Sequence, residues 1–258
     1  MVSAILALMY YHTHPFCSRR WRSKPYVAIK INNCDFVDRE AAQHELRISK
    51  TLANTNPLHE GFPYVRTLLD SFEMTGPDGS HICLVYEPMR EPLWLFQKRC
   101  RNGKLSLALV KAYLTFLLRG LDYLHSECHV VHTGMPMGPK RFRSCLMLAD
   151  LKSDNILVGF EDHAVIKDFV RSQASNPMAR KIKDGRVIYR SHNEFGPLKS
   201  FGILPKIADF GLAQRINDSR RNIHPIQPDH YRAPEVVLGI GWSYSVDIWN
   251  LGVLVSPF

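Results

Sequence analysis

Short apolar runs dominate the first part of the chain and predict strands. Residues 26–31, 65–73 and 81–86 are each rich in apolar, β-branched or aromatic side chains. Between the first two runs, good helix formers follow Asp38, which can cap a helix that ends near Leu52. We therefore expect a small lobe of strands with one helix.

Helical periodicity takes over after Glu87. In residues 105–125, leucines and other apolar side chains recur three and four positions apart, which predicts the clearest helix of the chain. The sequence thus predicts an α+β protein with two lobes, residues 23–87 and residues 88–258. The segment from Glu87 to Met89 joins the lobes, and a cleft at such a junction is the usual place for a ligand.

Three segments do not follow this pattern. Residues 1–22 resemble neither lobe, and we leave them as an unassigned leader. Residues 134–149 begin with glycines and prolines and are interpreted as an insertion. Residues 159–205 form a long polar connection with an excess of basic residues, which we expect to be a loop. Loops of this length are uncommon inside a compact domain and need an explanation.

Composition narrows the class of protein. Apolar residues make up 45% of the 258 residues, which excludes a wholly disordered chain. The net charge of +9 suits an anionic partner, although a solvated basic surface is the simpler explanation. The six cysteines include no C-x-x-C pair, so we expect no zinc site and favour reduced thiols in the cytoplasm and/or nucleus. No apolar stretch is long enough to suggest a membrane partner.

The first chemical signal is Lys30, at the end of the run Val-Ala-Ile-Lys in residues 27–30. A lysine at the end of a strand can reach the phosphates of a nucleotide in the cleft. Alone, this match is better explained as a surface lysine on a strand. Glu45 lies in the middle of the predicted helix, where a carboxylate can hold Lys30 by an ion pair.

The second signal is the polar run of residues 150–155, which precedes a short apolar strand at residues 156–158. Asp150 can accept the proton of an incoming hydroxyl group. Lys152 can steady a transferred phosphoryl group, and Asn155 can bind Mg²⁺. Taken alone, this run is also explained as a charged loop.

The third signal is Asp-Phe-Gly at residues 209–211, followed by Ala-Pro-Glu at residues 233–235. Asp209 can bind the Mg²⁺ that bridges nucleotide phosphates, and Phe210 would pack inward. A single Asp-Phe-Gly occurs often by chance. The occurrence of four motifs in this order and at this spacing excludes a chance match.

Over roughly residues 23–254, this series of motifs resembles the eukaryotic protein kinase family. The resemblance implies a two-lobe kinase fold with ATP and Mg²⁺ as cofactors. It implies that Lys30 and Glu45 form an ion pair at the ATP site. It also implies that Tyr86 is the gatekeeper, and that Glu87 and Met89 bond adenine through their backbone.

The same resemblance assigns the phosphate-transfer roles. Asp150 is similar to the catalytic base and Lys152 to its helper. Asn155 and Asp209 are similar to the metal ligands. Asp247 is similar to the aspartate that braces the catalytic loop from the central helix of the second lobe.

Narrower features resemble the SR-protein kinases, especially their fungal members. Lys152 favours a Ser/Thr kinase, and Thr133 stands where most kinases have arginine. The sequences of residues 231–235 and 242–250 are also similar to this group. The expected partner is a protein substrate, with Arg/Ser-rich sequences as one candidate class. We expect no direct nucleic-acid binding and leave the oligomeric state open.

Three departures from the kinase pattern point to an incomplete kinase. Residues 1–22 contain no glycine, so the Gly-rich loop is absent, and residues 134–149 separate Thr133 from Asp150. The chain also ends soon after its last helix begins, and we expect this to leave the supporting residue Glu235 buried without its usual partner. An unspliced or incomplete gene model would explain all three. A catalytically inactive kinase-like fragment or binding scaffold is the alternative function.

Overall fold

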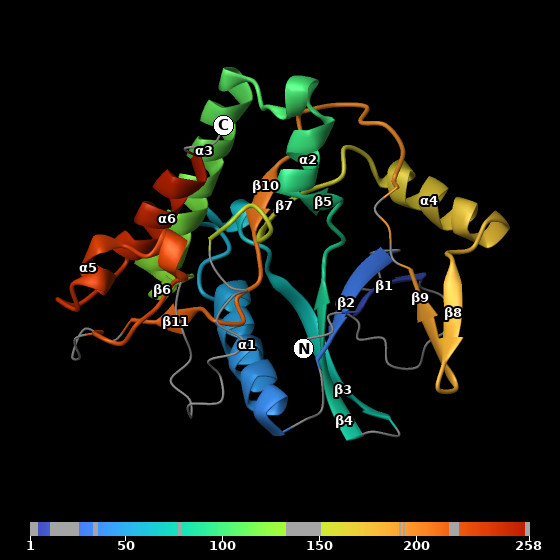
Figure 1. The fold of residues 1–258 in the computed structure, drawn as a ribbon, viewed down its shortest axis with the longest axis horizontal. Coiled ribbons are helices and arrows are strands. Elements are labelled where there is room, and N and C mark those ends of the chain that lie inside the picture. Colours follow the sequence, from blue (N-terminus) through green and yellow to red (C-terminus); the bar gives the residue numbers. More distant parts are fainter. Residues whose placement is uncertain are drawn as a thin grey trace.

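A computed structural model describes residues 5–10, 26–32, 36–76, 79–132, 151–190, 192, 194–216 and 222–255. A sheet with one long helix occupies the lower part of Figure 1, and most helices lie in the upper part. The two-lobe α+β arrangement predicted from the hydrophobic pattern is confirmed. Within the described ranges, no helix is long and apolar enough to span a membrane.

The strand-rich lobe is a four-stranded antiparallel sheet in the order β1-β2-β4-β3, with one helix. Its elements are β1 (Ile5–Tyr10), β2 (Tyr26–Ile31), α1 (Phe36–Asn54), β3 (Leu68–Gly76) and β4 (Gly79–Tyr86). Three strands and the helix overlap their predicted ranges. The edge strand β1 lies inside the segment that the sequence left unassigned.

The described part of the second lobe is mostly helical and contains three small sheets, ordered β10-β7-β5, β11-β6 and β8-β9. A π-helical turn, Tyr123–Glu127, extends the longest of its helices. The elements are β5 (Glu91–Pro92), α2 (Leu93–Arg99), α3 (Leu107–Asp122), β6 (Val130–Val131), β7 (Ile156–Val158), α4 (His163–Ser175), β8 (Arg180–Lys183), β9 (Arg186–Tyr189), β10 (Pro205–Ile207), β11 (Gln214–Arg215), α5 (Pro234–Val237) and α6 (Ser245–Val255).

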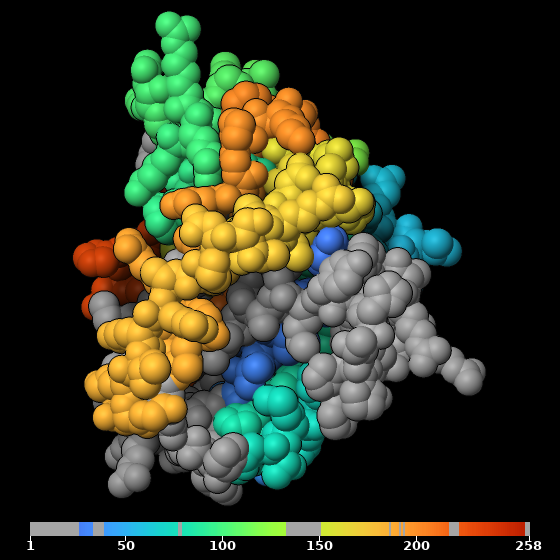
Figure 2. Space-filling view, turned by 90° about the vertical axis from the view of Figure 1, so that its right-hand side faces the viewer, coloured from blue at the N-terminus to red at the C-terminus, as the bar shows by residue number. Residues whose placement is uncertain are grey.

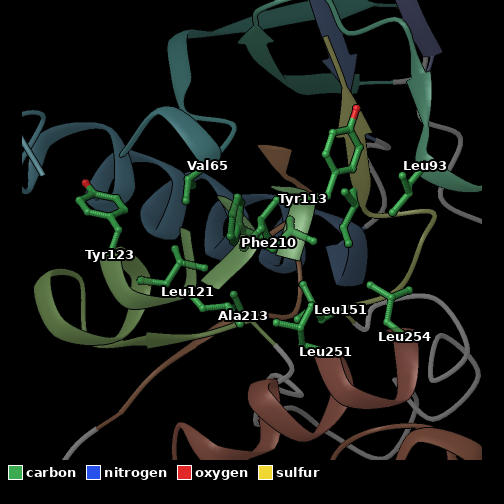
Figure 3. Packing of buried hydrophobic residues seen from close by; sticks show 14 of the residues in the cluster. Val65, Leu93, Tyr113, Leu121, Tyr123, Leu151, Phe210, Ala213, Leu251 and Leu254 are labelled. Atoms are coloured by element: carbon green, nitrogen blue, oxygen red, sulfur yellow. The ribbon is translucent and has the colours of Figure 1, made fainter. Parts of the chain in front are cut away.

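The core of this lobe surrounds Phe210, which is 2% exposed. In Figure 3, Leu251 and Leu254 of α6 point toward Leu151, and Leu121 of α3 lies on the other side of the cluster. Replacing a buried aromatic side chain with alanine commonly costs about 3–5 kcal/mol. The core therefore fixes the backbone on both sides of Phe210.

The expectation that residues 159–205 form a loop is wrong. Asp162 caps α4 by accepting a hydrogen bond from the Ala164 amide, and an aspartate at this position is a common helix start. Buried Val165 and Phe169 then hold the helix against the lobe. A hairpin, β8-β9, follows α4, and Figure 2 shows both in yellow and orange on one face of the molecule.

The C-terminal end of α1 is tied to the helical lobe. The Tyr123 hydroxyl group donates a 2.7 Å hydrogen bond to the Leu52 carbonyl. Just beyond the helix, Nδ2 of the Asn56 side chain donates a hydrogen bond to Glu127 Oε2 over 3.0 Å. Both donor–acceptor pairs join residues 71 positions apart, so this end of α1 is fixed by long-range contacts.

Candidate active site

Three charged residues from separate elements converge between the lobes. Lys30 lies on β2, Glu45 in α1, and Asp209 just after β10. Lys30 Nζ lies 2.8 Å from Glu45 Oε1 and 3.2 Å from Asp209 Oδ1. The ion pair expected between Lys30 and Glu45 is therefore present, and Asp209 contacts the same ammonium group.

The three charges control one another's protonation. Burial would lower the pKa of Lys30, but the charges of Glu45 and Asp209 outweigh burial and hold that pKa above its ordinary value. Burial would raise the pKa of Asp209, yet Lys30 holds it below its ordinary value. Burial raises the pKa of Glu45, and Lys30 opposes that rise. The Asp209 side chain is 41% exposed, against 5% for Glu45, so Asp209 is the ionised carboxylate that a ligand can reach.

The segment that contains Asn155 lies beside the one that contains Asp209. The Ala208 amide donates a 2.8 Å hydrogen bond to the Asn155 carbonyl, and the Asn155 amide donates to the Lys152 carbonyl over 2.9 Å. Antiparallel pairing of β7 with β10 continues this contact. Asp150 lies outside the described residues, as do Thr133 and the insertion at 134–149, so their roles stay predictions.

Asp247 of α6 contacts the start of the segment that leads to the insertion. Its Oδ2 accepts 2.8 Å hydrogen bonds from the His132 amide and from His125 Nε2. His132 Nε2 in turn donates to the Ala208 carbonyl over 2.9 Å. Burial would raise the pKa of Asp247, but the His125 hydrogen bond holds it below its ordinary value. Asp247 thus links α6 to the backbone at His132, as expected of a bracing residue.

The segment between the lobes has contacts that the sequence did not predict. The Glu87 carbonyl accepts hydrogen bonds from Arg66 Nε at 3.3 Å and Nη2 at 2.9 Å, and the Glu87 carboxylate pairs with Lys206 Nζ at 2.8 Å. The Arg66 guanidinium also lies 4.7 Å from the centre of the Tyr86 ring. Met89 is buried. Arg66 thus already contacts the Glu87 carbonyl, and the adenine contacts expected of Glu87 and Met89 stay predictions.

A second ionic cluster, also missed from the sequence, lies directly beyond Met89. The Arg90 side chain is fully buried, and its Nη1 lies 3.0 Å from both carboxylate oxygens of Glu161. Its Nη2 donates a 2.6 Å hydrogen bond to the Gly196 carbonyl. The neighbouring Glu91 pairs with Arg99 at 2.7 Å. We call Arg90, Glu91, Arg99 and Glu161 the hinge cluster; it fastens residues 159–205 to the connection between the lobes.

A pocket of about 690 Å³ lies beside the hinge cluster. Its lining includes Glu87, Met89, Phe160, Ile166 and Lys206. Neither Lys30 nor Asp209 lines it. The pocket is therefore separate from the charged end of the cleft.

The expectation for Glu235 is wrong. Its carboxylate accepts a 2.7 Å hydrogen bond from the Ser245 hydroxyl group, and the residue is only half-buried. A water-accessible carboxylate with a local donor avoids the cost of a buried, unpaired charge. The contact joins the start of α5 to the start of α6, because Glu235 and Ser245 lie in the first turns of these helices.

Comparisons with known proteins agree with this arrangement. A serine/threonine protein kinase of Aspergillus fumigatus is 36% identical over 93% of this chain and 52% of its own length. A protein of Physarum polycephalum named serine/threonine-protein kinase SRPK is 31% identical over 89% of this chain and 53% of its own. The chain thus spans about half the length of these curated relatives.

A crystal structure of a kinase domain superposes with a TM-score of 0.58 at 26% identity, covering 89% of this chain and 55% of the other. The family described as protein kinase domain matches residues 16–257, which include every candidate site residue named above. This chain belongs to the protein kinase family.

Proposed function

We propose that this chain supplies the nucleotide cleft and transfer residues of an ATP-dependent serine/threonine protein kinase. One observation carries the proposal: Lys30 is held between Glu45 and Asp209, which come from the opposite lobes. An ammonium group fixed at this place can bind phosphate oxygens, while Glu45 keeps it from swinging away. Membership of the kinase family supports this assignment.

The residues present fit a magnesium nucleotide. No group of three or more His, Cys, Asp or Glu side chains in the described part of the chain could hold a metal ion by itself. Asp209 and Asn155 offer one carboxylate and one amide oxygen, and Mg²⁺ commonly takes its remaining ligands from substrate phosphates and water. Bound ATP would supply the phosphoryl group that is transferred. We assign Asp209 and Asn155 as metal ligands, with Asp150 as the base.

The backbone around the cleft supports these roles. Asp247 fixes the His132 amide, and the Asn155 carbonyl fixes Ala208, so both segments that lead to the transfer residues are held. Catalytic side chains need such support, because misplacement by about 1 Å can cost roughly a hundredfold in rate.

The proposal also extends to the class of protein substrate. Lys152 and the similarity to the Physarum SRPK favour serine or threonine in an Arg/Ser-rich protein. The scattered cysteines favour the cytoplasm and/or nucleus. Phosphate transfer from labelled ATP to an Arg/Ser-rich peptide, compared with the same peptide carrying lysine for arginine, tests the substrate class.

Calorimetric titration with Mg-ATP tests the nucleotide site. Lys30→Ala and Asp209→Asn should each weaken binding by roughly tenfold to a hundredfold, because a hydrogen bond to a charged group contributes about 1.5–3 kcal/mol. Lys167→Ala and Asp168→Asn in α4 are matched controls that remove the same charges from exposed positions. Unchanged affinity in both test variants would refute the site.

Activity separates the enzyme from the binding scaffold. Phosphate transfer that is lost in Asp150→Asn, while nucleotide binding persists, supports the kinase. Nucleotide binding without any transfer by the parent chain supports the scaffold instead.

A further inference from the structure

The hairpin β8-β9 is specified by its own sequence. Its two-residue turn is Asp184-Gly185, with φ of 50° and 72°. A two-residue turn of this kind needs positive φ at both positions, and Asp-Gly is among the preferred pairs for it. The strands pair in register from Lys183–Arg186 outward to Arg180–Tyr189.

One face of the hairpin is apolar and exposed. Residues that face each other in an antiparallel pair project to the same side, and alternate residues share a face. Ile182 pairs with Val187, and Tyr189 lies two positions further along β9. Their exposed fractions are 76%, 47% and 56%. Three large apolar side chains in so short a hairpin exceed what a purely solvated turn requires.

The opposite face is mainly basic. Lys181 and Lys183 alternate with Ile182 along β8, so they project to the other side. Both are exposed, and neither forms an ion pair with any residue that the structure describes. Residues 179–190 carry five basic side chains and one acidic side chain, Asp184. The face of Lys181 and Lys183 also carries Ile188, and the face of Ile182 and Tyr189 also carries Arg180. The hairpin is therefore mainly basic on one side and mainly apolar on the other.

The outer edges of the hairpin complete the surface. Within the described ranges β8 and β9 form a sheet of two strands, so each is bonded along one side. An isolated hairpin is only marginally stable in water, and a third strand with an apolar face stabilises it. Lysines on an edge strand commonly prevent the strand from pairing with other chains and aggregating. This role would explain Lys181 and Lys183, but it does not explain why Ile182, Val187 and Tyr189 are exposed.

We propose that β8-β9 binds an extended, acidic segment of a partner protein, which adds to the hairpin as a third strand. Side chains of an added strand alternate between the two faces. A segment of alternating acidic and apolar residues would place its carboxylates beside Lys181 and Lys183, and its apolar side chains beside Ile182 and Val187. This surface is separate from Lys30 and Asp209, so the inference does not rest on the proposed kinase activity.

Fluorescence anisotropy with the full chain tests the proposal. The probe is a short labelled peptide of alternating aspartate and valine, and its control has the same composition with all aspartates before all valines. We expect the alternating peptide to bind roughly tenfold more tightly. Equal binding of the two peptides would overturn the proposal, because it would show simple charge attraction.

Two double variants separate the faces. Lys181→Ser/Lys183→Ser and Ile182→Ser/Val187→Ser should each weaken binding of the alternating peptide roughly tenfold. Lys104→Ser/Lys111→Ser removes two exposed lysines elsewhere and should change nothing. All six substituted side chains, the four lysines together with Ile182 and Val187, are exposed. The variants should therefore keep the melting temperature of the parent protein. Unchanged binding in either hairpin variant would contradict strand addition.

The last ligand in the anisotropy experiment is a single-stranded RNA with the same net charge as the alternating peptide. We expect it to bind more weakly than the alternating peptide and to be insensitive to Ile182→Ser/Val187→Ser. Tighter binding of the RNA would overturn the proposal in favour of a nucleic-acid surface.

Discussion

The cleft cluster (Lys30, Glu45 and Asp209) and the hinge cluster use the same kinds of charge in opposite ways. In the cleft, side-chain exposure rises from 5% at Glu45 through 16% at Lys30 to 41% at Asp209. In the hinge cluster, Arg90 and Glu91 are fully buried and Glu161 is 2% exposed. The cleft therefore keeps one carboxylate open to a ligand, whereas the three buried charges of the hinge cluster are enclosed by partners.

This difference in exposure indicates that the ionic contacts of the hinge cluster stabilise the fold, whereas those of the cleft cluster serve ligand binding. A buried pair adds little net stability over an apolar pair, but loss of one partner leaves a charge without solvent and is costly. A partly open pair is screened by water and contributes less when broken. Mutations should therefore damage stability at the hinge cluster and ligand binding at the cleft.

The largest expected effect follows Arg90→Ala. The variant leaves Glu161 buried and unpaired, so the free energy of unfolding should fall by about 3–5 kcal/mol. Denaturant unfolding measures it, with Arg171→Ala as control, because Arg171 is 69% exposed and forms only a 3.9 Å pair. A loss below about 1 kcal/mol would mean that water reaches Glu161.

The combined change Arg90→Met/Glu161→Leu sharpens this prediction. It removes both charges and keeps apolar volume, so it should be more stable than Arg90→Ala alone. Both variants lose the Arg90 hydrogen bond to the Gly196 carbonyl, so if the double variant is the less stable of the two, an unpaired Glu161 charge is not the cause of the loss.

Glu45→Gln should have an intermediate effect. The amide keeps the shape of the side chain but removes the charge opposite Lys30, which costs about 1–3 kcal/mol of unfolding free energy. Mg-ATP affinity should fall as well, because Lys30 would be held by Asp209 alone. Gln43→Ala, at an exposed position of α1, is the control. Stability lost without any loss of affinity would contradict a link between the helix and the nucleotide.

Acid should weaken the link through Asp247. Because the folded-state pKa of Asp247 is lowered, its contribution to stability is fully present above the unfolded value of about 3.9 and is lost as pH falls through the folded value. Asp247→Asn should therefore show a shallower fall in melting temperature between about pH 5 and pH 3. Parallel pH curves for the two proteins would refute this assignment.

Asp209→Asn should have the smallest effect on stability. Its side chain is 41% exposed, so the free energy of unfolding should change by less than about 1 kcal/mol. Comparison of unfolding curves with those of Arg90→Ala tests the contrast directly. A loss as large as that of Arg90→Ala would remove the distinction between the clusters.

Local periodicity predicted much of the fold. The apolar runs at residues 26–31 and 156–158 match β2 and β7, and the leucine spacing of residues 105–125 matches α3. The strands are short runs of apolar residues and the helix repeats apolar residues at helical spacing, and both patterns are visible in the sequence itself. The hairpin β8-β9 was missed, although Asp184-Gly185 is a hairpin signal.

The candidate site divides in the same way. Motif spacing predicted Lys30, Glu45 and Asp209. It did not predict Arg90, whose partners Glu161 and Gly196 lie 71 and 106 positions away. Nothing local distinguishes such an arginine from a solvated one, because only the folded chain brings its acceptors close.

Because the C-terminal end of α1 is bonded to the helical lobe, the helix can tilt about that end. The fixed point is Leu52, whose carbonyl is bonded to Tyr123. Glu45 lies seven residues before it, which is about 10 Å along the helix axis. A tilt of roughly 10° about that point would move Glu45 by almost 2 Å. Such a displacement is enough to separate a contact of 2.8 Å, so a small tilt of α1 would release Lys30 without unfolding any element.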